Sequence, residues 1–165
     1  MRSNLSCFAG FVFISLLSSV AHAQGWEVFK ADKSGFGMLV PKGAQGVAFE
    51  KSGWKGLTWD FGGAKIIGLS RLGTYKSDLI RKAASDISGI PANLWKKVDE
   101  GKGSNGWKWL ETYTATDGKG LVFCVLGEGS SASYILYVIT TAADYQKNKA
   151  AYDAWYKSLT VYQAK

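Results

Sequence analysis

The sequence predicts an α+β fold in which an antiparallel sheet of about six strands is flanked by helices on both faces. Short runs rich in β-branched and aromatic residues recur about every ten residues between glycine-containing turns, which is typical of an antiparallel meander. Two other stretches have apolar residues at helical spacing. The runs 121–126 and 134–139 are apolar at nearly every position, so we expect central strands with helices packed on both sides.

Five of the expected strands lie in the first half of the chain. They are predicted at residues 26–29, 34–41, 47–51, 57–61 and 65–72. Pro41 ends the second strand, because proline has no N–H to donate to a neighbouring strand. Gly43, Gly53 and the pair Gly62-Gly63 mark turns between the strands. This spacing favours hairpin connections.

The hydrophobic period changes to that of a helix between residues 75 and 88. The apolar positions that recur at helical spacing are Leu79, Ile80, Ala83, Ala84 and Ile87. Thr74 is a candidate N-cap, since a threonine hydroxyl can accept from the free N–H groups of the first helical turn. Gly89 and Pro91 form a stop signal. Another strand is expected to start at Leu94.

The second half of the chain predicts three consecutive strands and a closing helix. The strand-like run that follows Gly106 is separated from the run 121–126 by Asp117-Gly118, a frequent hairpin turn. The third run covers 133–141. A helix follows with a stripe of apolar residues on one face, namely Tyr145, Tyr152, Trp155, Tyr156 and Leu159. Thr141 and Asp144 give this helix a start that resembles a capping box.

The segment 101–106 has the G-x-G-x-x-G spacing of a dinucleotide-binding loop. That motif requires a strand before it and a helix after it, because the helix N-terminus holds the pyrophosphate. Here the acidic pair Asp99-Glu100 precedes the segment, and the strand-like Trp107 run follows it. We therefore interpret the segment as a hairpin connection.

The first 23 residues have the features of a cleaved secretory signal peptide. Arg2 provides the positive start, residues 7–20 are largely apolar, and Ala21-His22-Ala23 is a small-x-small cleavage site. The apolar run is shorter than the roughly 20 residues that a membrane span needs. We therefore expect an exported protein, periplasmic or extracellular, with residues 24–165 forming a single globular domain without a stable membrane span.

Cleavage would remove the single histidine, one of the two cysteines and one of the 20 basic residues, and so lower the net charge from +7 to +6. A catalytic triad and a zinc site are improbable without histidine. We expect a non-enzymatic protein with no metal and no cofactor, and expect Cys124 to be buried. The lysines are scattered rather than clustered, which argues against nucleic-acid binding.

The strongest candidate for a binding surface is the strand that contains Trp107, Trp109, Glu111 and Tyr113. Period-two alternation places these four residues on one face of the strand. One interpretation is that the aromatic residues belong to the core. The other is an exposed aromatic platform for a glycan or peptide, with Trp109 as contact and Glu111 as polar anchor.

Two further observations bear on a site. Trp54 and Trp95 lie near turns, where partial exposure is expected, so both are candidate binding residues. A catalytic alternative would need carboxylates that converge from distant strands, for which Asp60, Glu111 and Asp117 are candidates.

The order of elements, together with Gly35-Phe36 and the proline at position 41, resembles the Mog1/PsbP-like family across most of residues 26–162. The resemblance implies an antiparallel sheet flanked by helices, an α/β/α sandwich. It also implies a mostly non-enzymatic role, since members include photosystem-associated lumenal subunits, small-GTPase-binding factors and bacterial envelope or secretion-chaperone proteins. No partner-binding residue of that family maps onto this chain.

The sequence therefore predicts an exported, non-catalytic binding or accessory protein that acts on another protein of the cell envelope. Alternatives are an inhibitor or immunity protein against a secreted enzyme, a cell-wall glycan-binding module, and an envelope enzyme. The sequence does not indicate an oligomeric state.

Overall fold

The computed structural model describes residues 25–165, so the predicted signal peptide, residues 1–23, lies outside the described part of the chain. The strands are β1 (Trp26–Ala31), β2 (Phe36–Pro41), β3 (Val47–Lys51), β4 (Trp54–Phe61), β5 (Ala64–Leu72), β6 (Trp95–Gly101), β7 (Trp109–Thr116), β8 (Leu121–Glu128), β9 (Ala132–Thr140) and β10 (Thr160–Val161). The helices are α1 (Ser77–Ser88), the short 3-10 helix η2 (Ala92–Leu94), α2 (Ala142–Lys147) and α3 (Lys149–Ser158).

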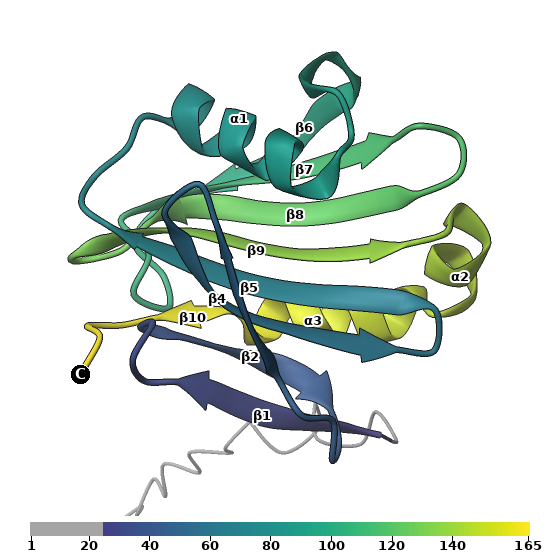
Figure 1. Ribbon diagram of the computed structural model, residues 1–165, viewed down its shortest axis with the longest axis horizontal. Coiled ribbons are helices and arrows are strands. Elements are labelled where there is room, and N and C mark those ends of the chain that lie inside the picture. Colours follow the sequence, from purple (N-terminus) through teal and green to yellow (C-terminus); the bar gives the residue numbers. More distant parts are fainter. Residues whose placement is uncertain (1–24) are drawn as a thin grey trace, which may run out of the picture.

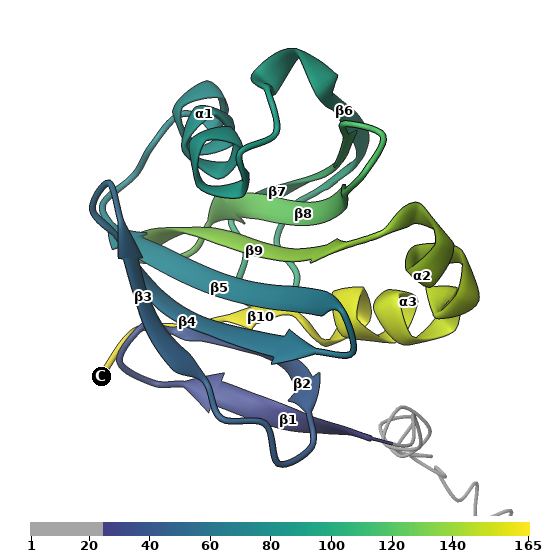
Figure 2. The same cartoon turned by 45° about the vertical axis from the view of Figure 1, so that its right-hand side comes forward.

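The strands form two antiparallel sheets (Figure 1). The larger sheet has seven strands in the order β3-β4-β5-β9-β8-β7-β6, and the smaller has three in the order β1-β2-β10. Figure 2 shows α1 on one side of the larger sheet, and the smaller sheet with α3 on the other. β9 lies between β5 and β8. The two strands predicted to be central, β8 and β9, are therefore interior strands, as expected from their continuous apolar sequence.

The predicted architecture of one sheet of about six strands with helices on both faces is wrong. The molecule is mostly β, its helices are short, and a second sheet covers much of one face. Every residue of β2 is buried, because this strand lies against the larger sheet. A Cβ added at Gly68 on β5 would lie 2.4 Å from the Phe36 ring, so the missing side chain makes room for β2. The strand pattern predicts that β1 and β2 exist, but not that they leave the main sheet.

Two hydrophobic cores lie on opposite faces of the larger sheet. Along β9, Tyr134 and Leu136 point into the core shared with the smaller sheet and α3, whereas Ile135 and Tyr137 point into the core under α1. Each buried aliphatic or aromatic side chain contributes about 1.5–3 kcal/mol relative to exposure. Cys124 lies in the α1 core and is fully buried, as predicted, and burial raises the pKa of its thiol.

The closing helix starts where predicted but is broken in the middle. Thr141 is its N-cap, and the Thr141 hydroxyl accepts from the Asp144 N–H at 3.1 Å. The chain leaves helical geometry at Asn148, which separates α2 from α3. Tyr145 and Tyr152 stack across this break with ring centroids 5.5 Å apart. Tyr152 is buried whereas Tyr145 is only partly buried, so the predicted apolar stripe is shared between two helices.

The helices of residues 25–165 include none that is long and apolar enough to cross a membrane. Over the same residues, His, Cys, Asp and Glu side chains form no group of three or more that could hold a metal ion.

Candidate binding groove

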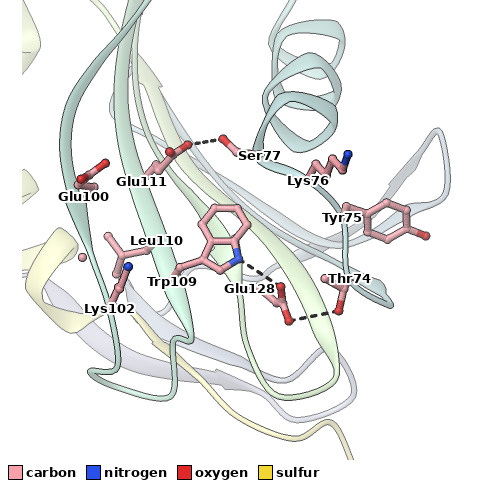
Figure 3. A pocket seen from close by; sticks show the side chains of 11 residues that line it. Thr74, Tyr75, Lys76, Ser77, Glu100, Lys102, Trp109, Leu110, Glu111 and Glu128 are labelled. Carbon is pink, nitrogen blue, oxygen red and sulfur yellow. Dashed lines mark hydrogen bonds between the residues drawn. The ribbon is translucent and has the colours of Figure 1, made fainter.

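A groove of about 900 Å³ lies beside the start of α1. The segment from β5 to α1 forms one side, and β6 with the adjoining ends of β7 and β8 forms the other (Figure 3). Its lining residues are Thr74, Tyr75, Lys76, Ser77, Glu100, Gly101, Lys102, Trp109, Leu110, Glu111 and Glu128. We call it the α1 groove.

Strand register brings the charged and aromatic side chains of the α1 groove together. Trp109 on β7 pairs with Glu128 on β8, and Glu111 on β7 pairs with Glu100 on β6. Directly opposed residues of antiparallel strands project from the same face of a sheet. Trp109 and Glu111 also share a face, as the alternation of β7 predicts.

Glu128 fixes the indole of Trp109 at the centre of the α1 groove. Trp109 Nε1 donates to one carboxylate oxygen at 3.1 Å, while Lys108 Nζ at 2.8 Å and Thr74 Oγ1 at 3.2 Å donate to the other. The Lys108 bond is the main reason that the pKa of Glu128 is lowered; the Trp109 and Thr74 bonds act in the same direction, against the cost of burial. Glu128 is therefore an ionised, buried acceptor.

Glu111 is held in the same way from the α1 side. One carboxylate oxygen accepts from the Ser77 hydroxyl and, at 2.9 Å, from the Tyr113 hydroxyl. Lys97 Nζ lies 3.4 Å from the other oxygen. Partial burial alone would raise the pKa of Glu111, but these hydrogen bonds and the Lys97 charge outweigh it, and the pKa is lowered. Lys97 also contacts Glu100 at 2.7 Å, so it separates two like charges.

The N-cap prediction for Thr74 is wrong. Lys76 occupies the N-cap position of α1, with φ −63° and ψ 147°, and no side chain caps the helix. The Thr74 hydroxyl donates to Glu128 instead, and the Ser133 hydroxyl binds the Tyr75 N–H at 3.2 Å. These bonds hold the segment between β5 and α1 against the ends of β8 and β9.

Of the four predicted binding residues, Trp109 and Glu111 line the α1 groove, whereas Trp54 and Trp95 do not. The partial exposure expected for these two tryptophans is wrong: Trp54 is 2% exposed and Trp95 is 7% exposed. Trp54 packs against Tyr75, and Trp95 Nε1 donates to the Ile90 carbonyl at 3.1 Å. A tryptophan near a turn can still point inward, because its large apolar surface favours burial.

Trp107 departs from the alternation expected for its strand. It precedes β7, and its N–H donates to the Ser104 carbonyl in the β6–β7 turn. Its ring packs on Tyr134 with centroids 5.7 Å apart, in the core on the other face of the sheet. The segment 101–106 is the hairpin connection that its context predicts.

Two acidic residues of the α1 groove, Glu100 and Glu128, were not among the candidates. Glu128 could have been found from the hairpin, since extending the pairing outward from the 117–120 turn places residue 128 opposite Trp109. Two of the three candidate carboxylates lie in other hairpins: Asp60 is 3.5 Å from Lys65, and Asp117 accepts from backbone N–H groups of its own turn.

No protein-family model matches this sequence, and no curated protein matches it. Among solved structures, the cyanobacterial PsbP (CyanoP) from Synechocystis sp. PCC 6803 is similar with a TM-score of 0.56 and 13% identity, over 95% of this chain and 98% of that one. A protein of unknown function from Pseudomonas aeruginosa, PA94, aligns with a TM-score of 0.43 and 12% identity, over 84% and 99% of the chains. The similarity to CyanoP shows that this chain has a PsbP-like fold.

Proposed function

We propose that this chain is an exported, non-catalytic accessory protein that binds another protein of the cell envelope in the α1 groove. The observation that carries the proposal is Trp109, which is half-buried at the centre of the groove and fixed by its bond to Glu128. Tryptophan is enriched among residues that dominate binding energy. A ring that is already immobilised loses little conformational entropy when a partner covers it.

The chemistry of the groove supports binding rather than proton transfer. A general acid near neutral pH needs a raised carboxyl pKa, whereas those of Glu111 and Glu128 are lowered. Both carboxylates already accept three hydrogen bonds from neighbouring side chains. Their evident role is to position Trp109, Ser77 and the segment between β5 and α1. The PsbP-like fold is compatible with an accessory role.

Site-specific crosslinking tests the proposal. Residues 24–165 carrying a photo-crosslinking amino acid at Glu100, on the exposed rim of the groove, are irradiated with the native envelope fraction. Val47, which is 62% exposed on β3, provides the control position. We expect one envelope protein to crosslink at position 100 but not at 47, and Trp109→Ala to lower its yield at least about fivefold.

The identity of the captured protein separates the alternatives. The purified protein should bind the wild-type chain directly and more weakly to the Trp109→Ala variant. A secreted hydrolase or toxin that loses activity when bound would favour the inhibitor function. Equal crosslinking at positions 100 and 47 would contradict binding in the α1 groove. Mass spectrometry of the native protein tests export, for which an N-terminus at Gln24 is expected.

A further inference from the structure

We infer that the segment bound in the α1 groove is acidic and carries an apolar or aromatic residue that packs on Trp109. The inference rests on the proposed function, since it specifies the chemistry of the partner at the same site. It is based on which charged side chains of the groove already have an ion-pair partner within the protein and which do not.

The three carboxylates that line the groove already have cationic partners. Lys97 lies 2.7 Å from Glu100 and 3.4 Å from Glu111, and Lys108 lies 2.8 Å from Glu128. Lys97 helps to lower the pKa of Glu111, and Lys108 helps to lower the pKa of Glu128. A basic ligand would therefore have to displace existing partners rather than fill vacant positions.

Two lining lysines are in the opposite situation. Lys76 and Lys102 are exposed, and neither has a carboxylate within ion-pair distance among residues 25–165. Figure 3 shows Lys76 on the α1 side and Lys102 on the β6 side, with Trp109 between them. The uncompensated charge on both sides of the groove is therefore positive, which complements carboxylates of a partner.

The apolar side chains that lie between the two lysines indicate that the ligand also carries an apolar group. Trp109 and Leu110 are half-buried and line the groove. The rim residue Tyr75 already packs against Trp54 and carries the Arg71 guanidinium 4.6 Å from its ring centroid. The indole of Trp109 is thus the aromatic surface left for a ligand, and an aromatic pair contributes about 0.5–1.5 kcal/mol beyond its buried area.

The probes are three end-blocked pentapeptides with a central phenylalanine, flanked by glutamates, by serines or by lysines. Each competes with the captured envelope protein for crosslinking at position 100, and its direct binding is measured by calorimetry at low salt. We expect the glutamate peptide to bind at least tenfold tighter than the lysine peptide, with the serine peptide between. Its affinity should fall as salt rises, because the contacts are exposed.

Charge reversal supplies the matched variants. The double variant Lys76→Glu with Lys102→Glu should weaken binding of the glutamate peptide at least tenfold. The control, Lys119→Glu with Lys149→Glu, makes the same change in net charge at exposed positions outside the groove and should change affinity less than about twofold. An acidic residue at position 76 is compatible with α1, since it lies at the helix N-terminus.

Two results would overturn the inference. One is a lysine or serine peptide that binds as tightly as the glutamate peptide; the other is equal binding by the groove variant and its control, with unchanged circular dichroism for both. If the envelope protein still crosslinks at position 100 in those cases, the proposed function stands and only the ligand chemistry is wrong. If the glutamate peptide binds as expected but no envelope protein crosslinks there, the inference holds and the proposed function fails.

Discussion

The α1 groove differs from a second groove, next to β3 at the edge of the larger sheet, in the residues that form its walls. The second groove, of about 630 Å³, lies between β1 and the β3–β4 hairpin, and we call it the edge groove. Phe29, Phe49 and Leu57 supply much of its apolar wall. Its nearest ion pair, Glu50 with Lys55 at 3.3 Å, is highly exposed. In the α1 groove, by contrast, the carboxylate that fixes the aromatic residue is largely buried: the Glu128 side chain is only 10% exposed and accepts from Trp109 Nε1.

Both grooves have apolar lining residues, so apolar surface in a hollow does not by itself distinguish a recognition site. Phe29 in the edge groove packs edge-on against Trp59, with centroids 5.0 Å apart, as core aromatics do. Trp109 is instead oriented by the hydrogen bond from its ring nitrogen to Glu128, and its half-buried ring lines the groove. We therefore propose recognition at the α1 groove rather than at the edge groove, and the expected effects of the variants below decrease in the order given.

The largest effect on stability is expected from a methyl group added at Gly127, where β8 lies close to β7 beside the α1 groove. A Cβ at Gly127 would lie 2.3 Å from the Trp109 carbonyl oxygen and 2.9 Å from the Leu110 Cα, both backbone atoms that cannot move aside alone. Gly127→Ala should lower the free energy of unfolding by about 2–4 kcal/mol, at or above the usual cost of overpacking. Urea unfolding followed by fluorescence measures it.

Gly101→Ala is the matched control, because its added Cβ would meet only the Leu110 side chain at 3.6 Å. It should change stability by less than about 1 kcal/mol. Equal losses for Gly127→Ala and Gly101→Ala would show that β7 and β8 do not approach as closely as described.

Truncation of one aromatic in each groove tests which groove binds the partner. Trp109→Ala should weaken binding of the envelope protein at least tenfold, since a central tryptophan commonly contributes about 2 kcal/mol or more. Phe29→Ala should change binding less than twofold, although it removes a contact with Trp59 and lowers stability. Affinity measured by calorimetry on folded variants decides; a larger loss for Phe29→Ala would transfer recognition to the edge groove.

The pH dependence of stability tests whether the buried carboxylate organises the α1 groove. The folded pKa of Glu128 lies below its unfolded value, so its contribution is complete above the unfolded pKa and disappears as pH falls through the folded pKa. Glu128→Gln should therefore be about 1–3 kcal/mol less stable than wild type at pH 7, a range typical of hydrogen bonds to charged groups.

The difference between wild type and Glu128→Gln should shrink as pH is lowered below about 4.3, the usual value for a glutamate. Urea unfolding at several values between pH 3 and 7 gives both curves. The same stability difference at every pH would mean that Glu128 acts through packing rather than through its charge.

The sequence predicts the strands and hairpins well because both depend on local information. Alternation assigns Trp109 and Glu111 to one face, and the 117–120 turn sets the register of β7 and β8. The second sheet depends on a contact between distant segments, Phe36 over Gly68, which no local pattern encodes. The exposure of Trp54 and Trp95 likewise depends on Tyr75 and Tyr113, which pack against them in the folded chain.

The smallest predicted effect is the difference in stability cost between breaking the ion pair of the edge groove and breaking that of the α1 groove. Lys55 and Glu50 beside the edge groove have side chains 69% and 59% exposed, so water screens their attraction, and Lys55→Ala should change stability by less than about 0.5 kcal/mol. In the pair of Lys108 with Glu128 the carboxylate is only 10% exposed, and Lys108→Ala leaves it with two donors instead of three. We expect a cost of about 1 kcal/mol for that variant, measured by urea unfolding at pH 7. Equal costs for the two lysines would contradict the distinction between the grooves, because burial of one partner is what makes a hydrogen-bonded charge pair stronger than an exposed one.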